Sequence, residues 1–237
     1  MIRIMAALLA LAVFATPAGA VDRRLSVTDF DRVTIEGPYQ VRLVVGRSSA
    51  ATVSGSLAAL DRVTVDVQGQ TLRIRRNRSA WGGTPGADAG PVTIELATRR
   101  LRSARLVGPA QLSIQGAAGL NVDFTVEGSG TLRAANVSAD NLALGLIGSG
   151  RLEIGGAAGV LRGDFQGGGS VDASNLTARS ATVTNATSGE VLLAVRGPAA
   201  VTNNGAGTVR VTGAPVCTIR GVSAAQVICE SDQRQHR

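Results

Sequence analysis

Aromatic side chains are scarce in this sequence. Four Phe, one Tyr and one Trp make up 3% of its 237 residues. Aromatic rings normally fill much of a thick globular core. A chain with so few of them and 30 glycines predicts instead a thin core of stacked Val, Leu, Ile and Ala side chains. Helix-period patterning is hard to find after residue 20, whereas alternating β-branched segments recur, as in residues 63–67, and this alternation predicts β-strands.

Lysine is absent, and histidine occurs once, as His236 in a polar C-terminal tail. A nucleophilic triad needs a histidine or an equivalent base beside its nucleophile, and a metal site needs several ligands held together. The sequence predicts neither, so we expect no cofactor, no metal and no catalytic residue of these kinds.

Apolar runs of about 20 residues, long enough to span a bilayer, are also missing. The apolar stretch at residues 4–15 follows Arg3 and precedes the small residues Ala18-Gly19-Ala20. This pattern predicts a secretory signal peptide over residues 1–20. We therefore expect a mature chain without a transmembrane segment, exported as a periplasmic or secreted bacterial protein.

Cysteine occurs only as Cys217 and Cys229. In an exported chain, a disulfide between them is the natural interpretation. Two buried thiols are the alternative, and a redox-active pair is disfavoured because the spacing is unlike Cys-x-x-Cys. We expect residues 214–237 to form a C-terminal cap with this disulfide and a polar tail.

All 24 positively charged side chains are arginines, and the formal net charge is +7. They cluster at residues 73–78 and 99–105. Such clusters attract anionic polysaccharide, lipid headgroups or nucleic acid, and the plainer alternative is a solvated strand face. Nucleic acid is the weakest candidate, because aromatic stacking platforms are missing and export separates the protein from the genome. The candidate patch for an anionic ligand consists of Arg73, Arg75, Arg99 and Arg100.

What the sequence has in abundance is a Gly-Ser-Gly punctuation. It reads FTVEGSGTL at residues 124–132, LGLIGSGRL at 144–152 and GDFQGGGSV at 163–171. The last small residue of each turn recurs at intervals of 20, 20, 19, 20 and 18 residues, from Ala110 to Gly207. A period this regular is typical of solenoids. The expected turn glycines are Gly128, Gly130, Gly148, Gly150, Gly167, Gly169, Gly189 and Gly207.

Coils of about 20 residues stack so that equivalent positions superpose. We therefore expect parallel pairing between neighbouring coils, and glycine corners whose backbone angles a Cβ would penalise. The predicted outward column places Arg133 next to Glu153, followed by Asp172, with a surface ion pair of little energy between the first two. The predicted inward aliphatic column consists of Leu132, Leu152, Val171, Val191 and Val209.

Before the repeats, residues 21–107 are expected to form a β-strand section that is continuous with the solenoid of residues 108–213. Residues 63–74 predict an antiparallel hairpin that turns at residues 68–70, with Leu72 and Ile74 inward and the arginines beside them outward. Residues 77–91 are rich in Gly and Pro and predict a loop. Within it, Trp81 either stacks on a ligand or folds back onto the strands.

With these residues placed, the chain resembles the family called putative auto-transporter adhesin, head GIN domain, over residues 25–215. The resemblance rests on the strand at residues 30–45 with its Gly37, on the strand pair at residues 63–74, and on the glycine turns that end at Gly207. It implies an all-β fold: a right-handed parallel β-helix similar in outline to pectin-lyase-like folds, preceded by antiparallel strands, with a non-enzymatic role in adhesion. The turns Gly108-Pro109-Ala110 and Thr187-Ser188-Gly189 depart from the pattern, and we expect distorted corners there.

Enzymes on such folds commonly act on acidic polysaccharides with paired carboxylates. Overlaying the coils places Glu153 and Asp172 in adjacent coils of one column, about 4.8 Å apart along the stack. No third acid joins them, so catalysis is not the favoured interpretation. Asp123 and Asp164 each precede a Phe and are expected to cap corner amides. Asn136 and Asn175 are expected to be isolated turn residues.

Three functions follow as hypotheses. The first is an exported non-enzymatic module for adhesion, or for binding polysaccharide or another envelope or surface polymer. The second is a polysaccharide lyase or glycoside hydrolase on a pectin-lyase-like fold. The third is a structural envelope protein that self-associates through the exposed ends or faces of its coils. The sequence leaves the oligomeric state open.

Overall fold

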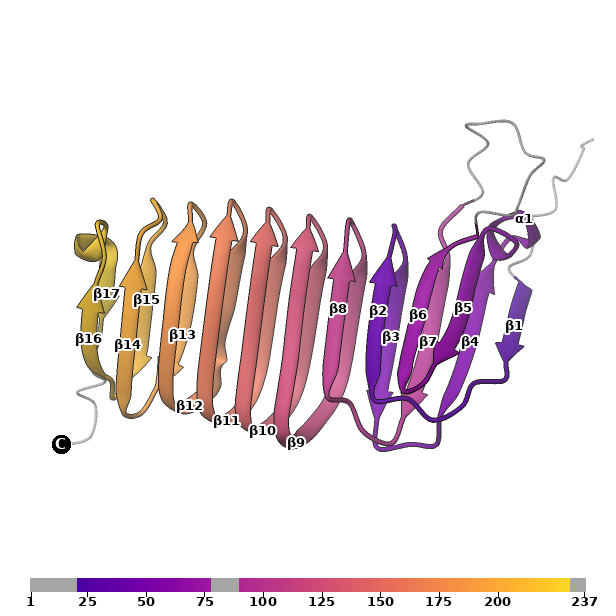
Figure 1. Ribbon diagram of the computed structural model, residues 1–237, viewed down its shortest axis with the longest axis horizontal. Coiled ribbons are helices and arrows are strands. Elements are labelled where there is room, and N and C mark those ends of the chain that lie inside the picture. The colour runs from indigo at the N-terminus through magenta and orange to yellow at the C-terminus, as the bar shows by residue number, and fades with distance from the viewer. Residues whose placement is uncertain (1–20, 78–89, 231–237) are drawn as a thin grey trace, which may run out of the picture.

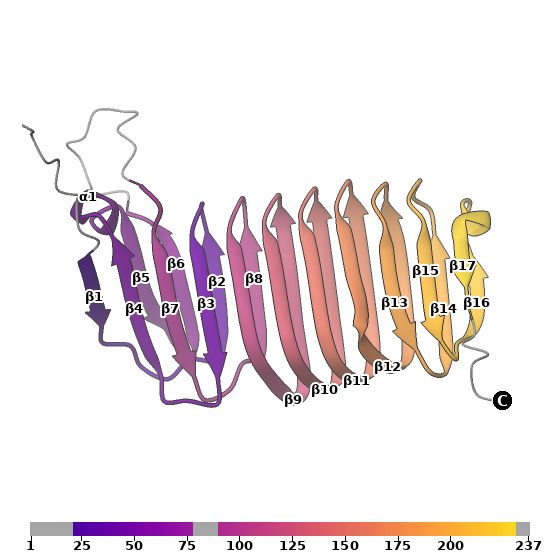
Figure 2. The same ribbon diagram turned by 180° about the vertical axis from the view of Figure 1, so that it is seen from behind.

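The computed structural model describes residues 21–77 and 90–230, and these form one elongated β-solenoid (Figures 1 and 2). The strands stack along the long axis as two facing sheets, and turns join the sheets along two long edges. The predicted signal peptide, Trp81 with most of its loop, and His236 lie outside the described residues.

Four long strands in the centre each form a complete coil. They are β9 (Gln111–Gly128), β10 (Thr131–Gly148), β11 (Arg151–Gly167) and β12 (Ser170–Thr187). In the later coils the two halves are separate strands, namely β13 (Val191–Val195), β14 (Pro198–Asn203), β15 (Val209–Gly213), β16 (Val216–Arg220) and β17 (Val227–Cys229). All of these neighbours pair in parallel, which confirms the predicted stacking. The hand of the coil stays a prediction.

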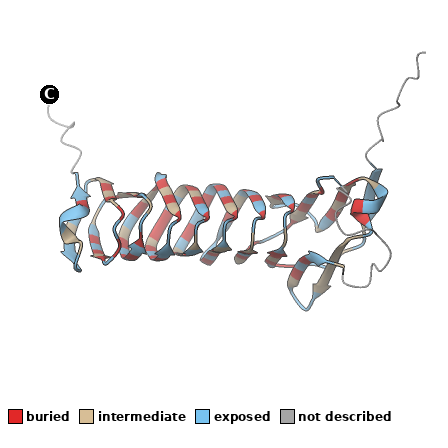
Figure 3. Ribbon diagram, turned by 90° about the horizontal axis from the view of Figure 1, so that it is seen from above, coloured by how far each residue is buried: buried red, intermediate tan, exposed pale blue. Residues whose placement is uncertain are grey.

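The inward aliphatic column lies where the period predicts it. Leu132 pairs with Leu152, which pairs with Val171, and the column continues through Val191 to Val209. Each of these five side chains is at most 1% exposed. Figure 3 shows buried and exposed residues alternating along the coils. Each coil therefore supplies the apolar surface that covers its neighbour, and this mutual burial is the main source of stability.

On the opposite sheet, the core changes character along the stack. The ring of Phe165 fills the space beside Gly163, where an added Cβ would lie 2.5 Å from the ring. One coil later the Phe165 position becomes Asn185, which pairs with Asn203. Both amides are fully buried, and Asn185 Nδ2 donates to Asn203 Oδ1 at 2.8 Å. The core of the C-terminal coils thus contains a hydrogen-bonded ladder of amides. Each amide supplies a partner that the other needs once it is buried.

The N-terminal strands enter the stack out of sequence order. Strand β2 (Arg32–Glu36) lies between β6 (Thr71–Arg76) and β8 (Ser103–Val107), while β3 (Gln40–Val45) lies between β7 (Thr93–Thr98) and β9. The antiparallel strands β1 (Val21–Leu25), β4 (Ala50–Gly55) and β5 (Val63–Gln68), with helix α1 (Leu57–Leu60), complete the N-terminal end. Parallel and antiparallel strands therefore both occur in this section.

Strands β5 and β6 form the hairpin predicted at residues 63–74. Gly69 in its turn has φ of +62°, a left-handed conformation that glycine adopts without strain. Leu72 and Ile74 are fully buried, whereas Arg73 and Arg75 are exposed. The period-two alternation therefore predicted both the turn and the facing of this hairpin.

The glycine edge is the name we give to the turns at residues 108–110, 128–130, 148–150, 167–169, 187–189 and 205–207, which lie along the top in Figure 1. Gly128, Gly148 and Gly167 have φ between +107° and +114°, as the prediction of unusual backbone angles requires. That explanation is wrong for a second group, whose φ is not positive. These glycines lie against the preceding coil, and a Cβ on Gly150 would stand 2.6 Å from the carbonyl oxygen of Gly130. The second group consists of Gly130, Gly150, Gly169, Gly189 and Gly207.

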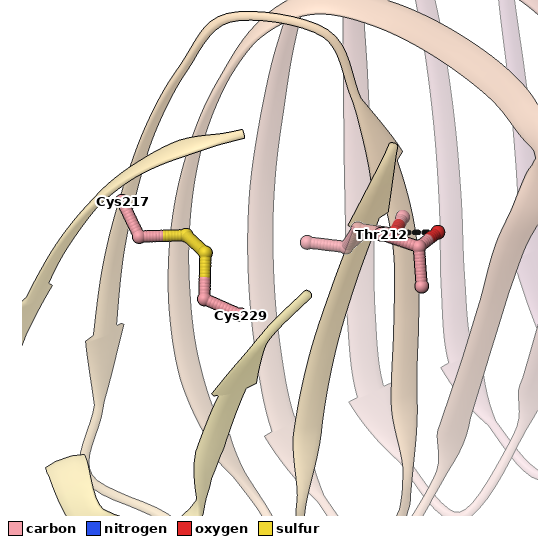
Figure 4. The surroundings of a disulfide bond; sticks show 4 residues. Thr212, Cys217 and Cys229 are labelled. Carbon is pink, nitrogen blue, oxygen red and sulfur yellow. Dashed lines mark hydrogen bonds between the residues drawn. A yellow bond between two sulfur atoms is a disulfide. The ribbon is translucent and has the colours of Figure 1, made fainter. Parts of the chain in front are cut away.

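Cys217 and Cys229 form the predicted disulfide in the last coil, with their Cα atoms 6.6 Å apart (Figure 4). Cys217 pairs in register with the buried Ala199 of β14, and Cys229 pairs with the buried Val211 of β15. The bond therefore joins the two sheets across the core. The chain between the two cysteines carries the short helix η1 (Ala224–Gln226).

Candidate binding groove on the edge opposite the glycines

A groove of about 650 Å³ lies on the edge opposite the glycine edge, where the coils of β8 to β11 cross between the sheets. Four arginines from three segments of the chain line it, together with small apolar residues and two asparagines. We call it the arginine groove. Its defining residues are Arg32, Arg100, Arg102, Leu120, Asn121, Asp123, Asn141, Ala143 and Arg162.

The groove arises because the coils differ in shape along this edge. Strand β9 crosses between the sheets with Gly116 at φ of +75° and leaves Leu120 70% exposed. Asn136, expected as a turn residue, has φ of 58° at the next crossing, the only positive value among the described non-glycine residues. The connection before β8 is anchored by Leu101, which is 1% exposed. Because side chains alternate around that buried anchor, the arginines on either side of it are exposed.

A buried carboxylate holds two of the arginines. Asp31 is 6% exposed, and its Oδ2 lies 3.1 Å from Nε of Arg102. The other oxygen, Oδ1, lies 4.0 Å from Nε of Arg32 and accepts no hydrogen bond within the described chain. Arg100 and Arg162 form no ion pair with any residue in the described ranges. The groove therefore contains two exposed guanidinium groups whose charge is not neutralised by a neighbour.

The amide side chains of the groove form a ladder on its surface. Asn141 Nδ2 donates to Asn121 Oδ1 at 3.1 Å, from one coil to the next. Asp123, the acid of the lining, accepts a hydrogen bond from the Thr125 hydroxyl at 3.2 Å. It pairs with a neighbouring side chain on its own strand and not with a corner amide as predicted. The lining thus offers hydrogen-bonding groups, apolar side chains and excess positive charge.

The predicted arginine patch divides between two places. Arg100 lines both the arginine groove and a smaller hollow beside it, which Arg99 also lines. Arg99 Nη1 lies 3.6 Å from Asp29 Oδ2. Arg73 and Arg75 lie outside the groove on the exposed side of β6, and Arg75 Nε is 3.4 Å from Asp66 Oδ1. Of the four predicted residues, Arg100 alone lines the groove itself.

The predicted carboxylate column is present but engaged by other groups. Glu153 pairs in register with Asp172, as expected. However, Glu153 Oε2 accepts from Arg133 Nε at 2.6 Å, and this hydrogen bond with its charge raises the pKa of Arg133. Asp172 Oδ1 accepts from the Ser174 hydroxyl at 2.6 Å. Asn175 lines the same shallow hollow as the two acids. The ion pair predicted between Arg133 and Glu153 is confirmed.

Asp164, the other acid expected at a corner, accepts from Gln166 Nε2 at 3.1 Å. Within residues 21–77 and 90–230, no group of three or more His, Cys, Asp or Glu side chains could hold a metal ion. In the same ranges, no helix has the length and apolar character to cross a bilayer. On the described surface, the arginine groove is therefore our candidate binding site, because it combines arginines, amides and apolar side chains in one hollow.

Sequence reasoning missed most of this groove. Asp123, Ala143 and Arg162 form one outward column with the 20- and 19-residue spacing of the coils. Extending the repeat register to residue 162 would have placed that arginine beside the crossing of β9. No sequence signal brings Arg32 there, because it belongs to the strand that enters the stack out of order.

Several solved structures have a similar fold. A putative adhesin from Bacteroides fragilis has a TM-score of 0.77 and 17% identity, and the alignment covers 90% of this chain and 97% of that one. A putative lipid binding protein from Parabacteroides distasonis has a TM-score of 0.67 and 18% identity, with 89% and 96% covered. A putative adhesin from Parabacteroides distasonis has a TM-score of 0.64 and 17% identity, with 90% and 95% covered. At these identities the likeness shows the fold.

No curated protein matches the chain. A family model, by contrast, matches residues 29–215, which is most of the sequence and includes strands β2 to β15 and the groove. The chain therefore belongs to the family described as "Putative auto-transporter adhesin, head GIN domain".

Proposed function

We propose that this protein is an exported, non-enzymatic adhesin-like module whose arginine groove binds an acidic polysaccharide of the cell envelope or surface. The observation that carries the proposal is that Arg100 and Arg162, which form no ion pair within residues 21–77 and 90–230, line one open groove. Guanidinium groups bind carboxylates, sulfates and phosphates with strong charge-assisted hydrogen bonds. Two such groups that form no ion pair with any described residue favour an anionic ligand.

The rest of the lining favours a polysaccharide over a lipid surface. Leu120 and Ala143 give the apolar faces of sugar rings a surface to pack on, and the amides of Asn121 and Asn141 suit hydroxyl groups. A membrane would need a broader apolar patch. Leu120 is the only large exposed apolar side chain of the groove.

Binding to a polymer also suits the shape of the molecule. The solenoid is long and its coils repeat (Figure 1). Arg162 lies within strand β11, and Arg100 lies in the connection before β8, next to the buried Leu101. Catalysis is not favoured, because Glu153 and Asp172 lie side by side on adjacent coils and are hydrogen-bonded to Arg133 and Ser174.

Isothermal titration calorimetry with polygalacturonate, with neutral dextran as a reference, tests the proposal. We expect Arg100→Ala/Arg162→Ala to weaken polygalacturonate binding by at least about tenfold, because each charged hydrogen bond contributes roughly 1.5–3 kcal/mol. The matched control is Arg151→Ala/Arg196→Ala, which removes two exposed arginines outside the groove that form no ion pair with a residue in the described part of the chain. This control should keep near wild-type affinity.

Two results would overturn the proposal. Equal losses in both double variants would mean that net charge alone attracts the polymer. Binding to vesicles of anionic lipid, with no binding to polygalacturonate or dextran sulfate, would replace the polysaccharide with a membrane surface.

A further inference from the structure

The two ends of the solenoid differ in how their edges are covered. At the N-terminal end, β1 runs antiparallel to β4 and carries the exposed charged residues Asp22, Arg23 and Arg24. Charges on an edge strand oppose further pairing. At the C-terminal end, β16 pairs only with β14 and β17 only with β15, within the described chain. The outer edges of both strands are therefore not paired with any other described strand.

Apolar side chains of the last coil lack a covering coil. Ile219 belongs to the inward column of Val183 and Val201. Those two valines are each 1% exposed, whereas Ile219 is 37% exposed. Residues 231–237, SDQRQHR, contain no apolar side chain. A second copy of the same coil offers the apolar side chains that would cover Ile219.

These outer edges have a self-complementary hydrogen-bond pattern. The Val216 N–H donates to Gly197 at 2.9 Å, and the Glu230 N–H donates to Val211 at 2.8 Å, so both point into the solenoid. Successive residues of a strand point their N–H and C=O groups to opposite sides. In β16 the groups of Cys217 and Ile219 therefore point outward, and in β17 those of Val227 and Cys229 do so.

The disulfide sets the relative height of the two strands. Because Cys217 is bonded to Cys229 and the strands run in opposite directions, Thr218 lies level with Ile228, and Ile219 with Val227. A two-fold axis through the level of Thr218 and Ile228 pairs both strands with their copies at once. Cys217 then meets Ile219 of the second copy across an antiparallel pair, and Val227 meets Cys229 in the same way.

We propose that the C-terminal coil is a two-fold interface through which two copies of this chain pair end to end, with β16 against β16 and β17 against β17. The pairing uses every outward backbone group named above and covers Ile219 with the disulfide of the second copy. It also places no like charges opposite each other, since Thr218 and Ile228 each face their own copy on the axis. Such an isologous contact closes at two subunits.

Sedimentation velocity over a concentration series, on the purified protein without reductant, tests this interface. We expect a species of twice the mass of one chain. Thr218→Arg/Ile228→Arg places arginines opposite their copies and should raise the dimer dissociation constant by at least about tenfold, because like charges across an interface are strongly unfavourable. Both side chains face solvent in the single chain, so the variant should fold. Thr182→Arg, two coils earlier in the outward column of Thr218, is the matched control and should stay dimeric.

A charge exchange makes the test specific to the proposed axis. Thr218→Glu/Ile228→Glu should also be monomeric, and an equimolar mixture of the Arg and Glu variants should restore the double mass. A single-chain mass at every concentration would overturn the proposal. So would a wild-type dimer that the Arg substitutions leave unchanged, or a mixture that stays monomeric.

Discussion

The chain turns from one sheet to the other at both long edges of the solenoid, but the turns are regular at one edge and irregular at the other. Along the glycine edge the coils turn almost identically, and a Cβ at Gly130 or Gly150 would stand 2.7 Å or less from a carbonyl oxygen of the coil before. Along the opposite edge the register shifts between Ala134 and Val137, and again between Glu153 and Gly156. Close stacking leaves the glycine edge with glycines and short side chains such as those of Ser129 and Ser149. The irregular edge has room for longer side chains and carries the arginine groove.

Alanine substitutions for glycine on the two edges should give the largest contrast. Gly150→Ala places a Cβ 2.6 Å from the Gly130 carbonyl oxygen and 2.7 Å from a Val126 methyl group. We expect it to lower the free energy of unfolding by about 3 kcal/mol, since overpacking distorts both coils. At Gly119 the nearest atom to an added Cβ is 3.9 Å away. Gly119→Ala should therefore change stability by less than about 1 kcal/mol. Urea unfolding measures the free energy of unfolding of both variants. Equal losses would contradict the proposed difference between the two edges.

The second largest contrast is expected between the two asparagine ladders, because one is buried near the glycine edge and the other is at the surface of the arginine groove. Asn203 is fully buried, accepts from Asn185 and donates to the Ser223 carbonyl oxygen at 3.0 Å. Asn203→Ala leaves the Asn185 amide unsatisfied, and we expect a loss of about 2 kcal/mol. Asn141→Ala removes a similar bond between exposed side chains and should stay within about 0.5 kcal/mol of wild type. Thermal unfolding compares the two, and a neutral Asn203→Ala would show that the buried ladder contributes no stability.

A smaller effect on the free energy of unfolding is expected in alkaline solution from Tyr39, which lies one coil before the first turn of the glycine edge. Tyr39, the only tyrosine, stands in register just before Gln40, as Ala110 stands before Gln111. Burial raises the pKa of Tyr39 above its ordinary value of 10.0, against a smaller lowering by Arg76. The folded protein therefore holds this proton more tightly than the unfolded chain. Stability should be fully present below pH 10 and decline as the pH rises beyond it.

Tyr39→Phe provides the control for this titration, because it removes the only phenol of the chain. Its free energy of unfolding should depend less on pH than that of the wild type between pH 9 and about 11. A wild type and variant with parallel pH profiles would mean that Tyr39 titrates alike in the folded and unfolded states.

The repeat period is enough to predict most of the fold, for a physical reason. Coils that stack in contact must have nearly equal lengths, so the glycine spacing alone places Leu132, Leu152 and Val171 in one column. The same spacing also places Asn185 and Asn203, which are 18 residues apart, in one column. Their burial was not predicted, because a polar side chain in a core position looks like a surface residue when only the hydrophobic pattern is considered.

The candidate site was less accessible to sequence reasoning. Arg32 neighbours Arg100 and Arg102 only because β2 is inserted between β6 and β8. No periodic signal precedes the first glycine turn, so nothing in the sequence marks that insertion. The clustering of arginines at residues 99–105 indicated Arg100, but the spatial partner Arg162 required the register of three coils.

Hydrogen–deuterium exchange with and without polygalacturonate tests most directly the claim that the irregular edge binds and the glycine edge only stacks. We predict slower exchange at residues 99–102, 118–123 and 141–143, with unchanged exchange along residues 128–130 and 148–150. Protection of the glycine edge, or equal protection over both edges, would contradict this account.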